Sequence, residues 1–320
     1  MPINTGCPAH RPLDSNVQTI ALPDTRCAAF LVLTVNDSAA GHSTVRSVLG
    51  ATEDLTKDVL ARIGRQPFTC TVAIGSRVWA TLTDTSPPAE LAPFKAIAGQ
   101  THTAVATPGD LLYHLRADSM DVIVEFQKIL LTELGDAVTV ADTTTGFRYF
   151  DGRDLLEFVD GTANPIGLDL PDSTLVGDED ADHAGGCYIV VQKYLHDLPA
   201  WRKEPLGTRQ EIVGRTLFDN VELPDATEGQ KSHKTLCTIT DEDGEHDILR
   251  DNMPFATPGE GVYGTYFIGY SRRLWVIEKM LERMFLGDPP PLHDRILDFS
   301  HAVTGVTFFA PAPDFLAKIG

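Results

Sequence analysis

Residues 146–165 read GFRYFDGRDLLEFVDGTANP and are the most informative stretch of this 320-residue chain. Their centre is Asp160, which follows an apolar run and is followed at once by Gly161. Most Asp-Gly pairs form only a tight turn, because both residue types accept turn conformations. A carboxylate held in such a turn is also a candidate for proton transfer. Both interpretations stay open on this stretch alone.

Two later segments carry further chemically active side chains: KSHKTLC at 231–237 with His233, and HDILRDNMPF at 246–255 with Arg250 and Asn252. An arbitrary histidine among the ten of the chain is most often a surface or capping residue. Arg250 has two acidic neighbours, Asp247 and Asp251, with which it could form a surface ion pair. It also presents a rigid fork of donors that is always charged. In an extended segment, Asn252 would point to the same side as Arg250.

The composition is that of a globular protein with a large core. The chain has 42% hydrophobic and 22% charged residues and a net charge of −19. An acidic surface repels phosphate backbones, so no nucleic-acid partner is expected. The five cysteines are dispersed and contain no C-x-x-C pair. That pattern argues against a disulfide scaffold, a zinc site and an iron–sulfur cluster.

The first residues, MPINTGCPAHRPLDSN, lack a basic region followed by an apolar segment and lack a twin arginine. They therefore predict neither a signal peptide nor a transit peptide. No apolar run reaches the roughly 18 residues of a spanning helix. The expected location is the cytoplasm, with no membrane partner.

The same order of elements occurs twice along the chain. Apolar, β-branched runs predict strands, and apolar residues at helical spacing predict helices. The expected strands are 27–35, 68–75, 110–116, 136–149, 186–193, 262–270 and 303–309, and the expected helices are 43–63, 118–134 (with Asp118 as N-cap), 199–214 and 272–286. The acidic segment 167–184 and the segments 219–230 and 241–247 are expected to be exposed loops. Two β-α-β-β-α-β-like halves predict an α+β protein of two ferredoxin-like domains with antiparallel sheets, 1–145 and 146–320.

The three motif segments, in this order and spacing, resemble the dye-decolorizing peroxidase family, in particular its short bacterial B-type members. The resemblance extends from the AAFLVLTV strand to VTFFAPAPDFL near the end of the chain. It implies the duplicated ferredoxin-like architecture, with the haem pocket in residues 146–320. It also implies a haem b peroxidase that reduces hydrogen peroxide and oxidises dyes, phenols or other small reductants through ferryl intermediates. Glu157, Ala163 and Leu217 depart from residues common in the family.

The resemblance implies that His233 is the axial ligand of the haem iron. Such a ligand usually donates its other N–H to a second group, which fixes the ring and raises its basicity. The family uses an acid in a segment like DRILDFS, here residues 294–300. Asp294 is the candidate and Asp298 the alternative. An aspartate that opens such a segment is also a typical helix N-cap, so Asp294 has two interpretations.

On the other side of the haem, the resemblance implies that Asp160 transfers the proton of the peroxide. It also implies that Arg250 stabilises the developing charge and that Asn252 orients peroxide or water. An aspartate, with an ordinary pKa of about 3.9, accepts protons at mildly acid pH. Arg250 is also a candidate for contact with a haem propionate, and further candidates for haem contact are Gly161, Thr162, Asn164, Arg215 and Phe267. Trp201, Trp275, Tyr188 and Tyr194 are candidates for carrying electrons to bulky substrates, although most such aromatics are simply packed.

Two other function classes remain on the sequence alone. A haem-handling protein for storage or transfer needs the iron ligand and the pocket but not the distal pair. An acidic ferredoxin-like binding protein needs no cofactor. Because Asp160 and Arg250 are both present, the enzyme is favoured. The expected assembly is a homo-oligomer, dimer or larger. The chain is not expected to be encapsulin cargo, because it stops at Lys318-Ile319-Gly320, directly after APAPDFLA.

Overall fold

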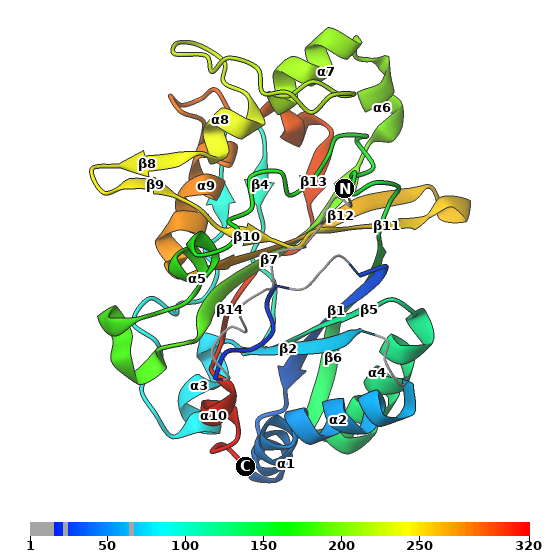
Figure 1. Ribbon diagram of the computed structural model, residues 1–320, viewed down its shortest axis with the longest axis vertical. Coiled ribbons are helices and arrows are strands. Elements are labelled where there is room, and N and C mark those ends of the chain that lie inside the picture. The colour runs from blue at the N-terminus through cyan, green and yellow to red at the C-terminus, as the bar shows by residue number, and fades with distance from the viewer. Residues whose placement is uncertain (1–15, 22–24, 64–66) are drawn as a thin grey trace, which may run out of the picture.

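The computed structural model describes residues 16–21, 25–63 and 67–320, so Cys7 lies outside the described residues. Within this described part, one ten-stranded sheet runs through the molecule in the order β10-β12-β7-β14-β2-β5-β1-β6, with β11 and β13 added at its side. Every strand pair in it is antiparallel. Helices α1 to α4 of the first half lie in the lower part of Figure 1 and helices α6 to α9 of the second half in the upper part, whereas α10 lies low beside α1.

The first half supplies four strands of this sheet. Its elements are β1 (Cys27–Val35), α1 (Ala39–Gly50), α2 (Thr52–Ile63), β2 (Phe68–Ile74), α3 (Ser76–Thr83), the hairpin β3 (Ile97–Ala98) and β4 (Thr103–Ala104), β5 (Leu111–Ala117), α4 (Met120–Leu134), the 3-10 turn η1 (Gly135–Ala137) and β6 (Val138–Phe147). Successive β1 side chains point to opposite faces of the sheet. Leu31 and Leu33 join a core that includes residues of α1 and α4, whereas Phe30 and Val32 join a second core, and both cores contain residues of both halves. Both faces are buried, which explains why the run is continuously apolar.

The second half supplies the remaining strands and most helices above the sheet. Its elements are α5 (Asp169–Thr174), η2 (Asp178–His183), β7 (Cys187–His196), α6 (Leu198–Lys203), α7 (Leu206–Val213), α8 (His233–Cys237), the hairpin β8 (Ile239–Asp241) and β9 (Gly244–His246), β10 (Leu249–Arg250), β11 (Met253–Thr257), η3 (Pro258–Glu260), β12 (Val262–Ser271), α9 (Leu274–Leu286), η4 (Arg295–Asp298), β13 (Ser300–Ala302), β14 (Val306–Ala310) and α10 (Pro313–Leu316). α9 buries an apolar stripe that includes Ile277, Leu281 and Phe285. That stripe has the spacing that the sequence predicts for this helix.

The two halves repeat one strand order. The first reads β6-β1-β5-β2 and the second β14-β7-β12-β10, each with the first strand of its half between the fourth and the third. The predicted α+β fold with duplicated antiparallel sheets is therefore confirmed. The halves also join edge to edge, because β14 pairs with β2 at Phe309 and Ile74. The expected division between residues 145 and 146 falls inside β6.

Three predicted helices differ from the observed ones. The single helix expected over 43–63 is two helices, α1 and α2, because the chain leaves helical geometry at Ala51 and its N–H caps α1. The helix expected over 199–214 is likewise α6 and α7, divided at Pro205, which cannot continue a helix. The N-cap of α4 is Ser119 rather than Asp118, whose carboxylate instead accepts the Arg26 backbone N–H at 3.3 Å.

Two of the three expected loops contain regular structure. Segment 167–184 forms α5 and η2, and it buries Thr174, Val176 and His183. Its acidic composition suggested full exposure, but only one side of the segment faces solvent. Segment 241–247 contains the turn and second strand of the β8–β9 hairpin. Segment 219–230 contains no helix or strand, as expected.

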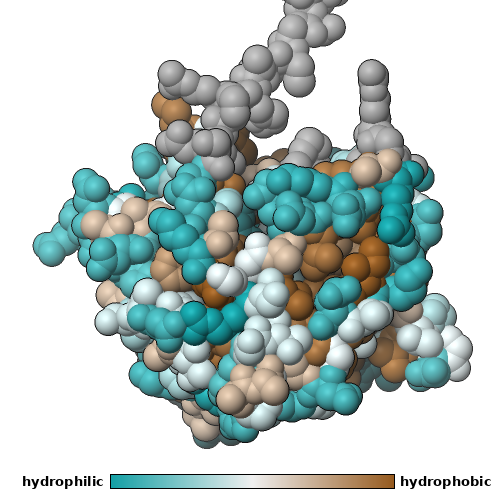
Figure 2. All heavy atoms as spheres, turned by 90° about the horizontal axis from the view of Figure 1, so that it is seen from below, coloured by the Kyte–Doolittle hydropathy of each residue, from teal (hydrophilic) through white to brown (hydrophobic). Residues whose placement is uncertain are grey.

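The face shown in Figure 2 is mainly hydrophilic, and the hydrophobic atoms visible on it lie largely in recesses between polar side chains. This agrees with the strongly acidic composition of the chain. None of the described helices has the length and apolar character needed to cross a membrane.

Candidate functional site

One cavity in the second half gathers most of the predicted site residues. Those that line it are Asp160, Gly161, Thr162, Arg215, His233, Arg250 and Asn252. Its apolar wall comes from the loop before α5, from β12 and from α9, with Leu156, Phe158, Phe267, Ile277, Met280, Leu281 and Met284. All residues that line it lie between Asp154 and Ser300. The cavity thus combines an apolar wall with many polar and charged side chains, an arrangement that can hold a cofactor with both apolar and charged parts.

His233 opens the short helix α8, where Ser232 caps the helix by accepting the Thr235 N–H. Its Nδ1 lies 2.6 Å from Oδ2 of Asp294, a residue that is completely buried. The other carboxylate oxygen of Asp294 accepts the Ile296 N–H at 3.0 Å and caps η4. Asp294 therefore contacts His233 with one oxygen and caps η4 with the other. Asp298, the alternative partner, lies instead against His102 and His293.

Cys237 is a neighbour of His233 that sequence reasoning missed. Its Sγ lies 3.7 Å from Nδ1 and 3.9 Å from Nε2 of that histidine. The spacing of four residues in KSHKTLC is the signal, since residues four apart on a helix share a face. Burial alone would lower the pKa of His233, but Cys237 and the Asp294 carboxylate raise it well above its ordinary value.

Two other histidines line the cavity, but their ring nitrogens contact other residues. Both ring nitrogens of His196 are occupied, Nδ1 by the Ser300 hydroxyl at 2.8 Å and Nε2 by the Thr265 hydroxyl at 2.9 Å. Burial also lowers the pKa of His196 to about 4. Nε2 of His246 lies 2.9 Å from Oδ1 of Asp241, a contact with the distance but not the geometry of a hydrogen bond. Of the three, His233 is the one whose Nδ1 is held by a buried carboxylate.

The loop that carries Asp160 presents its carboxylate to the cavity. Gly161 has a φ of +74°, which favours glycine, and its N–H donates to Oδ1 of Asp160 at 2.7 Å. Asn252 donates from Nδ2 to Oδ2 of Asp160 at 3.0 Å. Oδ1 of Asn252 in turn accepts the Ile268 N–H from β12 at 3.1 Å. The sheet therefore orients Asn252, and Asn252 orients the carboxylate.

Arg250 ends β10 and is fixed through its backbone. Asn164 accepts the Arg250 N–H at 3.0 Å and donates to the Arg250 carbonyl at 2.7 Å. Nε of Arg250 is buried without a hydrogen-bond partner among the described residues. Its side chain lines the cavity, and Asp251 pairs with Arg116 instead, so the ion pair with Asp251 considered from sequence is not observed. A buried, unsatisfied cationic donor points to an anionic or oxygen-bearing ligand.

The acidic neighbour of Arg250, Asp251, has a partner in the first half. Arg116 of β5 is buried and donates from Nη1 to Oδ2 of Asp251 at 2.8 Å. The same nitrogen donates to the Ile20 carbonyl at 2.9 Å. This ion pair connects β5 to the segment that carries Arg250 and Asn252.

A second carboxylate, Asp154, lines the same cavity and was not predicted. Its Oδ1 accepts the Phe158 N–H at 3.0 Å. Burial, with the negative charge of nearby Asp160, raises the pKa of Asp154 to about 7. The signal in the sequence was an aspartate at each end of the mostly apolar segment LLEFV.

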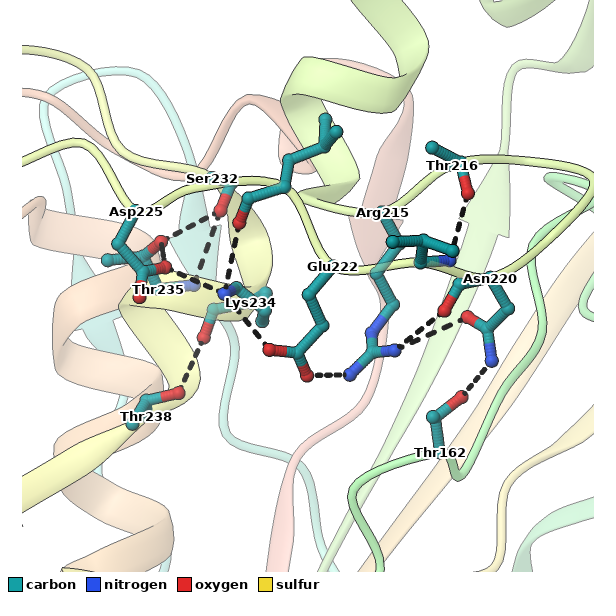
Figure 3. Close-up of polar contacts among 12 residues, drawn as sticks. Thr162, Arg215, Thr216, Asn220, Glu222, Asp225, Ser232, Lys234, Thr235 and Thr238 are labelled. Atoms are coloured by element: carbon teal, nitrogen blue, oxygen red, sulfur yellow. Dashed lines mark hydrogen bonds and ion pairs between the residues drawn. The ribbon is translucent and has the colours of Figure 1, made fainter.

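The rim of the cavity is a network of charges (Figure 3). Arg215 pairs with Glu222 and donates to the Asn220 carbonyl at 3.1 Å. Lys234 lies 3.5 Å from Glu222 and 2.9 Å from Asp225. Asn220 also donates to the Thr162 hydroxyl at 2.9 Å. Arg215 thus reaches the cavity as predicted, but its charge is already matched by a carboxylate.

Two family models match consecutive parts of the chain. The model described as Dyp-type peroxidase, N-terminal, matches residues 17–148, and the C-terminal one matches residues 151–315. The chain belongs to the Dyp-type peroxidase family.

Individual relatives are similar over almost their whole length. A dye-decolorizing peroxidase of Mycolicibacterium paratuberculosis is 50% identical over 300 residues, which are 93% of this chain and 84% of the relative. A variant of Rhodococcus jostii RHA1 DypB, solved in complex with heme, is 47% identical with a TM-score of 0.92, covering 95% of this chain and 98% of that one. The encapsulated DyP-type peroxidase of Mycobacterium smegmatis is 47% identical with a TM-score of 0.91, at the same coverages.

The departure of this Dyp-type peroxidase at Glu157 has a conformational consequence. Glu157 has a φ of +81°, a backbone conformation that favours the glycine of the family motif. Its carboxylate pairs with Arg209 of α7 at 2.9 Å. The side chain therefore gains a contact that glycine cannot make, although it occupies a backbone position that strains it.

The aromatic residues considered as electron carriers of the peroxidase occupy different environments. Trp201 and Tyr188 are buried, and the Trp201 indole donates to the Leu156 carbonyl at 3.0 Å. Tyr194 lines the cavity. Trp275 is 37% exposed and packs edge-on against the ring of His246, which lines the cavity, with 4.9 Å between centroids. Of these four aromatic residues, Trp275 is therefore the one that contacts a residue of the cavity wall and is also exposed to solvent.

Proposed function

We propose that this chain is a haem b peroxidase that reduces hydrogen peroxide and oxidises dyes, phenols or other small reductants, with His233 as the axial ligand of the iron. The observation that carries the proposal is the shared cavity. It combines the His233–Asp294 pair with the Asp160–Asn252 pair and the unpartnered Nε of Arg250. A haem carrier would need only the first of these three features.

The residues of the cavity fit haem b. Its wall of leucine, methionine, isoleucine and phenylalanine side chains suits the faces of a porphyrin. Asp294 holds Nδ1 of His233 and so leaves Nε2 to the iron, as a haem-binding histidine requires. The relative from Rhodococcus jostii was solved in complex with heme. When bound, the haem supplies the electron-transfer chemistry of the reaction.

In this proposal Asp160 transfers a proton of hydrogen peroxide. Its carboxylate accepts a proton from hydrogen peroxide and returns it to the oxygen that leaves as water. Asn252 and the Gly161 N–H each occupy one carboxylate oxygen, which fixes the direction in which Asp160 faces. Arg250 stabilises the negative charge that develops on the departing oxygen. Two electrons from the reductants and two protons complete the conversion of each peroxide into two waters.

The proposal is tested by titrating the purified chain with hemin and then adding hydrogen peroxide and a dye. We expect one hemin bound per chain, a Soret band typical of histidine ligation, and dye oxidation that requires peroxide. A complex with that Soret band but no peroxide-dependent oxidation would support a haem carrier. A chain that binds no hemin would support the cofactor-free binding protein.

The activity is expected to peak at about pH 4–5, because a carboxylate base remains competent below the ordinary histidine pKa of about 6.5. Above pH 7 the Asp154 carboxyl, whose pKa is about 7, adds a second negative charge beside Asp160. That charge opposes the one that forms on the leaving oxygen, so activity should fall as pH rises. Steady-state dye oxidation from pH 3 to 9 measures the activity below and above the expected optimum. Asp154→Asn should retain more activity above pH 7, and a wild-type rate that rises from pH 5 to 8 with intact haem would contradict the carboxylate base.

The assignment of domains is part of the same proposal. All residues that line the cavity belong to 146–320, which supports a C-terminal ferredoxin-like domain that holds the haem and an N-terminal one, 1–145, that supports it. A homo-oligomer, dimer or larger, stays a prediction.

Independence from an encapsulating shell also stays a prediction, and the encapsulated relative from Mycobacterium smegmatis makes it worth testing. In this chain Ile319 is buried and its carbonyl accepts from Nε of Arg46 in α1 at 3.3 Å. This packing supports the prediction for the residues up to Gly320. Co-expression with a mycobacterial shell protein, followed by sedimentation, is expected to leave the peroxidase outside the shell. Co-sedimentation that is lost when the last ten residues are deleted would contradict it.

A further inference from the structure

A second group of potential metal ligands lies outside the haem cavity. The Nε2 atoms of His102 and His293 each lie 2.9 Å from the same oxygen, Oδ1 of Asp298. All three ligand atoms lie within 4.8 Å of one another. The two rings meet edge to face with centroids 4.8 Å apart. The ring of His301 lies 6.1 Å from that of His102 and adds a further imidazole nearby.

The three ligands come from two distant parts of the chain. His102 sits in the turn of the β3–β4 hairpin, which packs against α9 in the second half (Figure 1). This hairpin approaches α9 so closely that a side chain at Gly99 would collide with the Phe285 carbonyl. The Gly99 N–H also donates to the His102 carbonyl at 2.9 Å, which fixes the turn. His293 and Asp298 flank the segment that contains Asp294.

We propose that His102, His293 and Asp298 bind a borderline divalent cation of the zinc class. Two imidazoles and one carboxylate are a ligand set that Zn²⁺ and neighbouring transition metals accept, with the remaining position left for water. The dispersed cysteines argued against a zinc site, but this set contains none. The net charge of −19 favours cations over anions near the surface.

The observed spacing is close to what such a cation requires. With metal bonds of roughly 2.0–2.2 Å, neighbouring ligands in a tetrahedron lie about 3.3–3.6 Å apart. The 2.9 Å separations must therefore open by about 0.4–0.7 Å, which is expected when the cation replaces the Nε2 protons. The side chains of His102 and His293 are 15% and 20% exposed, so the site is accessible yet sheltered. A bound cation would fasten the hairpin of the first half to the segment that holds Asp294.

The test is equilibrium dialysis of the haem-loaded protein against Zn²⁺, with the bound metal counted by atomic absorption. Haem loading matters because His233, Cys237 and Asp294 form another potential metal group that would otherwise compete. Repeating the dialysis in a His233→Ala background separates this test from the haem proposal. The variants are His102→Ala and Asp298→Asn, and the matched control is His42→Ala, a histidine of α1 paired with Asp37.

We expect one Zn²⁺ per chain in the wild type and in His42→Ala. Binding should weaken at least about tenfold in His102→Ala and Asp298→Asn. Zn²⁺ should also raise the melting temperature of the wild type but not of these two variants. A wild type that binds no Zn²⁺ at 100-fold molar excess would overturn the proposal. Equal binding by all four proteins would do the same, because the metal would then lie elsewhere.

Discussion

His233→Ala is expected to abolish stable haem binding. The variant removes the iron ligand and leaves the buried Asp294 carboxylate without the partner that lies 2.6 Å away. The two other histidines that line the cavity are placed differently, because both nitrogens of His196 are occupied and Nε2 of His246 lies 2.9 Å from the Asp241 carboxylate. The measurement is hemin titration followed by gel filtration, with the Soret band recorded for the fraction that retains haem.

Two further variants show whether the loss is specific to the ligand. Asp294→Asn keeps an oxygen for the η4 cap but weakens the hold on His233, so haem affinity should fall about 10–100-fold. His246→Ala removes another histidine of the same cavity and should bind haem like the wild type. A His233→Ala protein with an unchanged, histidine-type haem spectrum would show that the ligand is a different residue.

Replacing Asp160 and replacing Arg250 are expected to slow the reaction with peroxide with different pH dependences. Loss of a positioned proton-transfer group costs about 10²–10⁴-fold, and loss of an oriented charge-stabilising donor costs about 10²–10³-fold. Arg250→Leu should slow the first spectral change after mixing with peroxide at every pH, because arginine stays charged throughout. Asp160→Asn should slow it most where the aspartate is ionised in the wild type, which flattens the pH dependence. Stopped-flow absorption measures both.

The control for these two variants is Asp247→Asn, which changes another acid of the same cavity. It should leave the rate of that first change within a few-fold of the wild type. Haem content and spectrum must be matched among all variants, since Arg250 also lies at the haem position proposed here. If Asp160→Asn and Arg250→Leu both reacted at the wild-type rate, neither would take part in peroxide cleavage, and the haem carrier would become the better proposal.

The main strands and helices could be predicted from the sequence, because buried elements have a regular pattern of apolar residues. β1 is apolar on both faces, and α9 repeats apolar residues at helical spacing, so both were found from residues alone. The edge pairing of Phe309 with Ile74 was not found, because a contact across 235 residues leaves no local trace. Helix boundaries failed where Ala51 and Pro205 interrupt a continuous amphipathic pattern.

The site was predicted mainly through resemblance, and the structure shows why residues alone fall short. His233 and Asp294 lie 61 residues apart, and neither has a periodic context that marks it as a partner of the other. Asp154 was missed because an aspartate beside an apolar run looks like a turn, whereas its raised pKa depends on burial and on Asp160. Cys237 was a missed neighbour with a clear local signal, its spacing of four from His233.

The ion pair between Arg116 and Asp251 restricts how this protein can be rebuilt. A buried arginine and its carboxylate are costly to separate, because each would be left as an uncompensated charge. Here the arginine belongs to one half and the carboxylate lies between two candidate catalytic residues of the other. Chimeras that take their halves from different homologues should therefore fold and react normally only when both parents keep this pair. The two halves therefore have to be exchanged together with both members of this ion pair.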